Sequence, residues 1–234
     1  MSLKEFWDDQ AEPWGRFART PGHDSYHEGF NFPAFLELVP PAGRRTLDLG
    51  CGEGRVGAAL VGLGHTVVGV DSSPGMVALA RERHEALVAD AVALPFEDSA
   101  FDLVIAYMSV MNLDHPEAGL GEAARVLETG GRLCIAVVHP LDGAGAFEGD
   151  QFVIRGSYFE PEAKIWESDR GGIRVRFFDR ALPLGRLVGA CTAAGLLVEA
   201  VREPCPSPAF VAASPVAERR LRVPLFLHVR AVKP

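Results

Sequence analysis

The chain has 234 residues, of which 48% are hydrophobic, and its 31 acidic and 23 basic side chains give a formal net charge of −8. This length allows one sizeable core but not two large domains, so we expect a single domain over residues 1–234. The acidic balance argues against a nucleic-acid partner, because a protein that binds the phosphate backbone requires a basic face.

The cysteines and the hydropathy pattern exclude further classes. The four cysteines follow neither a zinc-ligand spacing nor a paired framework, so we expect no metal site, no structural disulfides and a cytoplasmic location. No apolar run approaches the roughly 18 residues that a helix needs to cross a bilayer, and the first nine residues are too acidic for a signal peptide. We therefore expect no membrane partner.

Residues 1–43 predict a helical cap ahead of the first strand. They hold Trp7, Trp14 and a polar, aromatic run, and they end in apolar residues at helical spacing before a proline pair. We expect this cap to cover the mouth of the turn that follows. In one interpretation Tyr26 and His27 only pack the cap on the domain. In the other they belong to a lid over a ligand pocket, with Tyr26 on the cofactor and His27 on the acceptor.

Residues 46–49 and the glycines after them predict a buried strand, a tight turn and the start of a helix. Gly50, Gly52 and Gly54 remove every second side chain, so the backbone can take positive φ and a ligand can approach the amides. The helix that begins near Arg55 leaves its first N–H groups unpaired, and these favour a carboxylate or phosphate. The pattern predicts a small-molecule site; a tight turn without a ligand is the plainer alternative.

Two motifs fit this turn, and the first is a dinucleotide fingerprint. Gly52, Gly54 and Gly57 satisfy G-x-G-x-x-G, with Asp71 downstream at the end of the next apolar run. In that frame the third glycine lies inside the helix and Asp48 has no role. This interpretation predicts an NAD-type oxidoreductase and stays open as an alternative.

The second motif is Asp48-x-Gly50-x-Gly52-x-Gly54. It resembles the first motif of class I S-adenosylmethionine-dependent methyltransferases and accounts for all four residues. The resemblance implies that the turn, including Cys51, borders the methionine part of the cofactor. It also implies that Asp48 orients the turn and the cofactor's charged ammonium end.

The chain then alternates strand and helix, which predicts a parallel sheet with right-handed crossovers. Residues 66–70 form the second predicted strand, and Asp71 follows at its carboxyl end. A carboxylate there can accept hydrogen bonds from both hydroxyls of a ribose, although a helix N-cap without a ligand is an alternative. Ser72 or Ser73 is expected to cap the next helix, and Ser72 and Met76 are expected to flank the adenosine.

A short third strand over residues 87–89 leads into Asp90 and Ala91. An aspartate followed by small and apolar residues offers an acceptor for an exocyclic amine beside an apolar wall, which suits an adenine ring. The run over residues 90–96 also resembles the corresponding segment of the methyltransferases, and the resemblance implies adenine contacts for both residues.

The fourth predicted strand covers residues 101–106, and Tyr107, Met108 and Met111 follow at its exit. In the family this exit lies beside the sulfonium and meets the acceptor, so we expect Tyr107 or Met108 at the cofactor and Met111 at the substrate. The alternative for the methionines is core filling.

A helix over residues 117–127 and a fifth strand over residues 132–138 complete the cofactor-binding core, residues 44–140. The fifth strand delivers His139 to the same edge of the sheet. Its near-neutral pKa makes His139 the best candidate for a general base, and a histidine that only hydrogen-bonds the loop is the alternative.

Residues 141–180 interrupt the alternation and predict an inserted β-hairpin built from residues 152–159 and 173–178. Placed over the sheet edge, such an insertion would shape an acceptor pocket, with Tyr158 and Trp166 among its lining residues.

The C-terminal part, residues 181–234, predicts a helix over 183–194, a strand over 196–201, a proline-rich loop and a last strand over 225–232. A strand that returns without a helical crossover should be antiparallel, which matches the family's sheet. We therefore expect an α/β fold with a seven-stranded, mostly parallel, Rossmann-like sheet whose last strand is antiparallel.

The resemblance covers residues 26–140 and implies methyl transfer from S-adenosylmethionine to an oxygen or nitrogen of a small-molecule acceptor. His139 would take a proton only if the acceptor is acidic, since a neutral amine needs only alignment. A macromolecular methyltransferase and a catalytically idle binder of the same cofactor are further alternatives.

Overall fold

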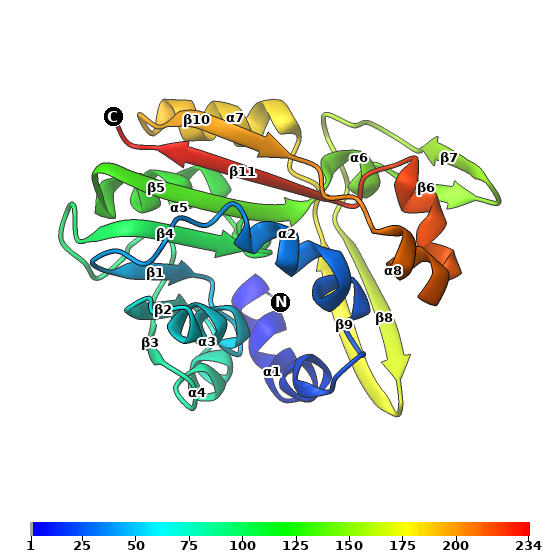
Figure 1. Ribbon diagram of the computed structural model, residues 1–234, viewed down its shortest axis with the longest axis horizontal. Coiled ribbons are helices and arrows are strands. Elements are labelled where there is room, and N and C mark those ends of the chain that lie inside the picture. The colour runs from blue at the N-terminus through cyan, green and yellow to red at the C-terminus, as the bar shows by residue number, and fades with distance from the viewer. Residues whose placement is uncertain (1) are drawn as a thin grey trace.

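The computed structural model describes residues 2–234, and a seven-stranded sheet runs through its centre (Figure 1). The strand order is β10-β11-β5-β4-β1-β2-β3. The strands are β1 (Thr46–Leu49), β2 (Val67–Asp71), β3 (Glu85–Val88), β4 (Phe101–Tyr107), β5 (Leu127–Val138), β10 (Leu197–Arg202) and β11 (Phe226–Val232).

The pairing of the strands confirms the predicted fold class. β11 runs antiparallel to both β5 and β10, whereas the other neighbouring pairs are parallel. In β1, Thr46 lies opposite Val67 of β2 on one side and Leu103 of β4 on the other. The carboxyl ends of β1, β2 and β4 therefore meet at one edge of the sheet, where parallel sheets of this kind bind their ligands.

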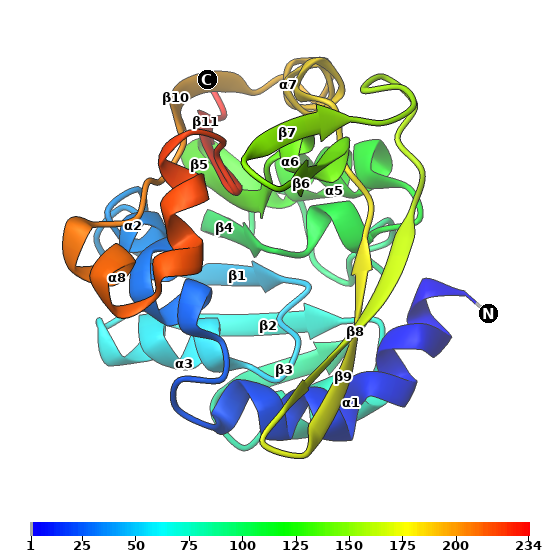
Figure 2. The same ribbon diagram turned by 90° about the vertical axis from the view of Figure 1, so that its right-hand side faces the viewer.

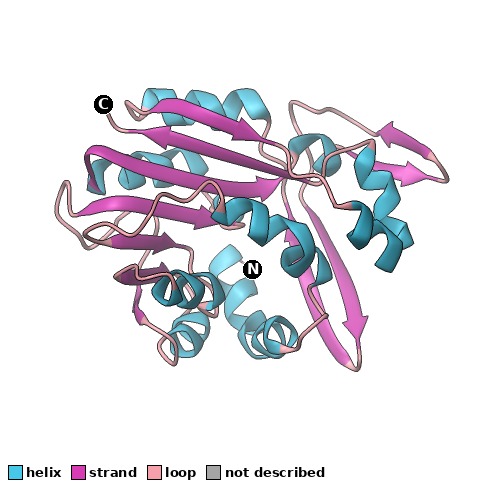
Figure 3. Cartoon of the chain, in the orientation of Figure 1, coloured by secondary structure: helices cyan, strands magenta, loops and turns pink. Residues whose placement is uncertain are grey.

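Helices cover both faces of the sheet (Figure 3). They are α3 (Arg55–Gly62), α4 (Pro74–Ala80), α5 (Pro116–Val126) and α7 (Leu184–Ala193). On the face covered by α5 and α7, Leu47 and Val104 share a buried cluster with Leu120. On the other face Ile105 packs with Val56 of α3. Burial on both faces explains why the central strands are continuously apolar rather than alternating.

The N-terminal segment is helical, as predicted. It comprises α1 (Leu3–Arg19), the π-helical turn η1 (His27–Asn31) and α2 (Phe32–Leu36). Ser2 caps α1 by accepting from the Glu5 amide at 3.2 Å, and the Glu5 carboxylate accepts from the Ser2 amide at 2.8 Å. This reciprocal capping box satisfies two otherwise unpaired donors and fixes where α1 begins.

The insertion differs from the single hairpin that was predicted. After the short helix α6 (Pro140–Gly143), β6 (Gly145–Glu148) pairs with β7 (Gln151–Ile154), and β8 (Lys164–Arg170) pairs with β9 (Ile173–Asp179). The predicted strand over 152–159 ends early, because Gly156 takes a φ of +74°. Figure 2 shows the β8–β9 hairpin lying along α1, and the Gln10 side chain accepts from the Arg176 amide at 2.9 Å.

The proline-rich segment before β11 is also not the loop that was predicted. It contains α8 (Pro208–Ala213) and the 3-10 helix η3 (Pro215–Leu221). Pro208 occupies the first turn of α8, where its missing N–H has no intrahelical partner to lose, and Ser207 caps the helix by accepting from the Phe210 amide. Pro208 and Pro215 are thus the first residues of the two helices in this segment.

Among residues 2–234, none of the helices combines the length and the apolar character that crossing a membrane requires.

Replacing Gly54 by alanine tests the geometry of the turn. Gly54 has a φ of +85°, and an added Cβ would lie 2.8 Å from Ala80 Cα, so we expect the free energy of unfolding to fall. Left-handed strain alone costs about 1 to 3 kcal/mol. Urea denaturation followed by circular dichroism measures the change.

Gly62→Ala is the matched control at the other end of α3. A Cβ at Gly62 meets nothing within 4 Å. Alanine there should be neutral or stabilise the protein by up to about 1 kcal/mol. Equal effects of the two substitutions would contradict the assigned turn geometry.

Candidate functional site

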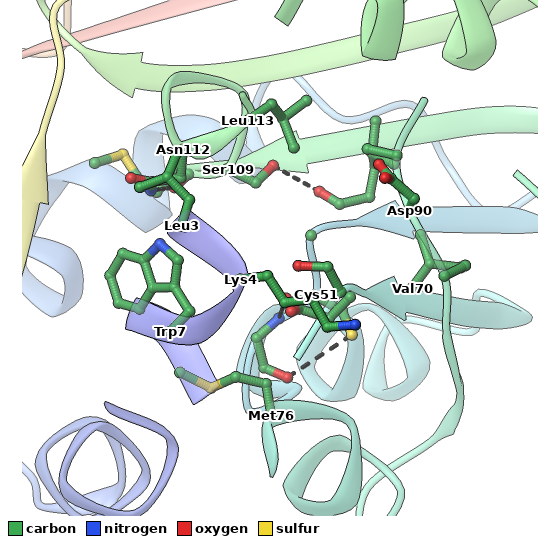
Figure 4. Close-up of a pocket in the computed structure, with 18 of the residues that line it drawn as sticks. Leu3, Lys4, Trp7, Cys51, Val70, Met76, Asp90, Ser109, Asn112 and Leu113 are labelled. Carbon is green, nitrogen blue, oxygen red and sulfur yellow. Dashed lines mark hydrogen bonds between the residues drawn. The ribbon is translucent and has the colours of Figure 1, made fainter. Parts of the chain in front are cut away.

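A cavity of about 350 Å³ opens at the carboxyl ends of β1, β2 and β4, and α1 closes one side of it (Figure 4). Ten of the twelve residues predicted to contact a cofactor line this cavity: Gly50, Cys51, Gly52, Asp71, Ser72, Met76, Asp90, Ala91, Tyr107 and Met108. The three strand ends that the sequence placed at one edge therefore do enclose a common space.

The glycines of the turn are required for different reasons. Gly50 has a φ of +73°, and a Cβ there would lie 2.4 Å from the Cβ of Ser109, whose hydroxyl donates to the Leu49 carbonyl at 2.6 Å. Gly50 thus lets the end of β1 pack closely on the exit of β4. A Cβ at Gly52 meets no atom within 4 Å, so this position leaves space for a ligand beside the backbone.

Asp71 joins the end of β2 to the glycine turn. One carboxylate oxygen accepts from the Gly52 amide at 3.0 Å, and the other accepts from the Ser73 amide at 2.9 Å. Burial raises the pKa of Asp71, and the two amide hydrogen bonds oppose that rise. Each carboxylate oxygen keeps a lone pair free, so the side chain can still accept from ligand hydroxyls.

Ser73, rather than Ser72, caps α4. The Ser73 hydroxyl accepts from the Met76 amide at 3.1 Å and donates to Asp8 of α1 at 2.7 Å. Ser72 is left free to line the cavity. The same contacts dock α1 on the start of α4.

Asp48 lies beneath the turn and is not part of the cavity lining. Its side chain is buried, and one carboxylate oxygen has no hydrogen-bond partner. Burial raises its pKa to about 7, and the neighbouring carboxylates of Glu53 and Asp71 contribute to that rise. A role for Asp48 in orienting the turn stays a prediction.

Two tryptophans of α1, Trp7 and Trp14, reach the cavity, which the sequence did not predict. Trp14 Nε1 donates to the carboxylate of Glu53 at 3.0 Å. The sequence did contain an indication of this, because Trp7 and Trp14 are seven positions apart and so lie on one face of a helix. The cap therefore closes the cavity with α1 and not with Tyr26 and His27.

Ionic contacts join the rest of the cap to the turn. Arg55 pairs with Asp24 at 2.9 Å and with Glu53 at 3.4 Å. His27 Nδ1 lies 2.9 Å from the hydroxyl of Tyr107, and burial, helped by the charge of Arg55, lowers the pKa of His27 to about 4. His27 thus holds Tyr107 from behind and does not line the cavity itself.

Two more predicted contacts lie outside the cavity lining because neighbouring side chains engage them. The ring of Tyr26 packs edge-on against Phe30 and Phe210, with centroids 5.6 and 5.7 Å apart. Met111 is buried in the main core cluster, so core filling describes it better than substrate binding.

The two residues predicted from the insertion also lie elsewhere. The Tyr158 hydroxyl accepts from the Leu184 amide at 3.2 Å. Trp166 stacks on Phe177 within the β8–β9 hairpin, with ring centroids 4.1 Å apart, and is 45% exposed. Neither residue lines the cavity, and the register that places Trp166 opposite Phe177 depends on strand pairing that the sequence did not reveal.

His139 does not have the geometry of a general base for this cavity. Its Nε2 bonds Glu203 at 2.8 Å, and its Nδ1 accepts from the Leu141 amide at 3.1 Å as the N-cap of α6. Burial lowers its pKa. The residue is absent from the cavity lining because β5 ends one strand beyond β4 in the sheet.

The charges of the cavity favour a cationic ligand. Carboxylates predominate among its charged residues, which are Glu53, Asp71, Asp90 and Asp114 against Lys4 and Arg55. Arg55 is already held by two carboxylates. A cation with a ribose and an adenine fits this surface, whereas a pyrophosphate would face like charge.

Comparison with known proteins finds similarity to methyltransferases. Residues 47–135 match the family model described as a methyltransferase domain. A demethylmenaquinone methyltransferase of Clavibacter sepedonicus is 42% identical over 104 residues, 42% of each chain. An O-methyltransferase of Pyrenophora dematioidea is 32% identical over 149 residues, 59% of this chain and 53% of that one. The chain thus spans about half the length of these curated relatives.

Solved structures share the fold over nearly the whole chain. An S-adenosylmethionine-dependent methyltransferase from Mesorhizobium loti superposes with a TM-score of 0.70 at 24% identity, covering 86% of this chain and 96% of that one. The [4+2]-cyclase SpnF superposes with a TM-score of 0.66 at 20% identity, covering 99% and 96%. The fold is that of the class I methyltransferases. The match to the methyltransferase-domain family model is confined to residues 47–135, the part of the chain that holds the glycine turn and Asp71.

The raised pKa of Asp48 predicts how stability depends on pH. The folded protein holds this proton up to about pH 7, whereas the ordinary aspartate value is 3.8. Because the unfolded chain loses this proton near pH 3.8, the stability that the protonated form contributes is complete below that pH and is lost progressively as the pH rises to about 7. We expect Asp48→Asn to gain stability relative to the parent protein between pH 5 and pH 8.

Urea denaturation of both proteins at each pH measures this difference. Subtracting one curve of unfolding free energy against pH from the other removes the contributions of groups that both proteins share. One of these groups is His27, whose pKa is lowered. Parallel curves would show that Asp48 is ionised throughout this range.

Proposed function

We propose that the protein transfers a methyl group from S-adenosylmethionine to a small-molecule acceptor in this cavity. The observation that carries the proposal is the position of the Asp71 carboxylate, hydrogen-bonded to the Gly52 amide at the wall of an acidic cavity. A hydroxyl-accepting group beside an open glycine turn suits an adenosyl cation, and the family match over residues 47–135 points the same way.

Each part of the cofactor has residues of matching chemistry. The backbone from Gly50 to Gly52 would border the methionine portion, and Asp71 would accept from the ribose hydroxyls. Asp90 and Ala91 would meet the adenine, while Tyr107 and Met108 would lie by the sulfonium. The remaining carboxylates of the cavity favour the positive charge.

When bound, the cofactor would supply an electrophilic methyl group to a nucleophilic atom of the acceptor. The electron pair of the broken carbon–sulfur bond would stay on sulfur, and the proton carried by the acceptor atom would be released to water. The protein's tasks are to align the two partners and to exclude water. The first turn of α1, with Leu3 and Trp7, covers the cavity and serves the second task. No step of this scheme requires His139.

The relatives widen the range of acceptor atoms. The sequence predicted oxygen or nitrogen, and the O-methyltransferase relative is consistent with oxygen. A second relative, from Roseobacter denitrificans, is a C-methyltransferase of ubiquinone and menaquinone biosynthesis. We therefore propose oxygen, nitrogen or carbon of a small molecule as the acceptor atom.

Replacing Asp71 by alanine tests the cofactor assignment. The change removes the acceptor for the ribose hydroxyls, so binding of S-adenosylhomocysteine should weaken by about 1 to 3 kcal/mol, or about 5- to 150-fold in Kd. Isothermal titration calorimetry measures the affinity, and thermal unfolding without ligand shows whether the variant is folded.

Asp150→Ala, at the exposed turn between β6 and β7, is the matched loss of one carboxylate and should leave the affinity unchanged. NADH provides the competing ligand in the same assay. Tight binding of NADH with none of S-adenosylhomocysteine would overturn the proposal in favour of a dinucleotide enzyme.

A further inference from the structure

Two polar atoms at one end of the cavity lack partners. Trp7 Nε1 and Asn112 Oδ1 are both buried without a hydrogen bond, and both residues line the cavity. Figure 4 shows them with Leu3 at the end away from Asp90 and Val70. A donor and an acceptor are thus left unpaired where the cofactor's adenosine is not expected.

Trp7 differs in this respect from the other tryptophans of the described residues. The other two tryptophans, both within the described residues 2–234, donate their indole N–H groups: Trp14 to Glu53 and Trp166 to Asp179. A buried polar group without a partner destabilises the folded protein. Unlike Trp14 and Trp166, Trp7 has a buried N–H without a hydrogen bond, and a bound molecule that accepts from it would remove this destabilisation.

The hydrogen bond made by Asn112 Nδ2 fixes the orientation of the Asn112 side-chain amide. Asn112 Nδ2 donates to the Met108 carbonyl at 3.0 Å, and a carbonyl can only accept, so the nitrogen must face Met108 and Oδ1 is the free atom. Met108 itself takes a φ of +56°, an unusual conformation for a residue with a side chain. The strained backbone at Met108, just after β4, thus holds the Asn112 side chain and leaves its Oδ1 as the unpaired atom at this end of the cavity.

The surroundings of the two atoms define the group that would satisfy both. The ring of Trp7 with Leu3 and Leu113 forms an apolar wall, which suits a flat hydrocarbon ring. A carboxylate would accept from Trp7 but be repelled by Asn112 Oδ1, and an ammonium would leave the Trp7 N–H unpaired. A neutral hydroxyl accepts the first bond and donates the second.

We infer that Trp7 Nε1 and Asn112 Oδ1 recognise a ring hydroxyl of the methyl acceptor, which assigns the acceptor to the hydroxylated aromatics, phenols or hydroquinones. This inference rests on the proposed function, because it takes the methyl group to lie near Met108. A carboxamide also offers both hydrogen bonds. However, a ring hydroxyl provides a nucleophilic oxygen or activates a ring carbon, and an amide does neither well.

The first turn of α1 must shift to admit such a ring, since solvent does not reach either atom in the closed arrangement. Trp7 lies on that turn, so its fluorescence should report acceptor binding. Trp7 and Asn112 are positioning residues for the acceptor and take no proton.

The test uses the full-length protein saturated with S-adenosylhomocysteine and titrated with 1-naphthol, 1-methoxynaphthalene and 1-naphthamide. The methoxy compound can accept from Trp7 but cannot donate to Asn112. We expect the parent protein to prefer naphthol about tenfold or more over both analogues, as sites built to pair a hydroxyl do.

The variants separate the two hydrogen bonds. Trp7→Phe keeps an aromatic ring and should weaken naphthol and methoxynaphthalene binding alike, by about tenfold. Asn112→Leu should abolish the preference for naphthol over methoxynaphthalene. Trp166→Phe is the matched control for loss of an indole N–H outside the cavity, and it should change nothing.

The outcomes distinguish this inference from the function on which it rests. Failure of the parent protein to bind S-adenosylhomocysteine would refute the proposed function. Normal binding of that ligand, together with no naphthol binding, a preference for naphthamide, or variants that behave like the parent, would refute the hydroxyl assignment alone. Loss of S-adenosylhomocysteine binding in Trp7→Phe would move Trp7 to the cofactor site and also overturn the inference.

Discussion

The hydrogen bond from the Gly52 amide to the Asp71 carboxylate is the contact on which the site depends. It joins two neighbouring strands at the point where each ends, and it holds the glycine turn in the backbone conformation that leaves the cavity open. Asp71 also accepts from Ser73, so one side chain sets the turn after β1 and the start of α4 together. A carboxylate that is already fixed by amides needs little reorganisation when a ligand hydroxyl arrives.

The N-terminal helix α1 packs against the glycine turn and the start of α4 and forms a further wall of the cavity. Ser73 and Gly75 at the start of α4 both donate to Asp8, and Glu53 in the turn accepts from Trp14. The wall that α1 provides is therefore anchored to the same two strand ends that shape the cofactor side. Because the fold is shared with a protein described as a [4+2]-cyclase, the sheet alone does not decide the reaction.

Local patterns predicted the sheet and most of the residues that line the cavity around the glycine turn. Asp71 is the last residue of β2, and the glycine turn and Asp90 follow their strands within one or two residues, so placing the strand also places these groups. His139 follows a strand too, but its strand lies beyond β4, and distance across a sheet is not a local property. The same holds for Trp166, whose environment depends on which strand pairs with β9. Trp7 and Asn112 became visible as partners only once α1 was placed against the exit of β4.

A crystal structure grown with S-adenosylhomocysteine tests the central claim most directly. The account predicts density for the ligand in the cavity, with both ribose hydroxyls within hydrogen-bonding distance of the Asp71 carboxylate and the adenine beside Asp90 and Ala91. Density for the nucleoside elsewhere, or a cavity that stays closed by side chains at saturating ligand, would contradict it.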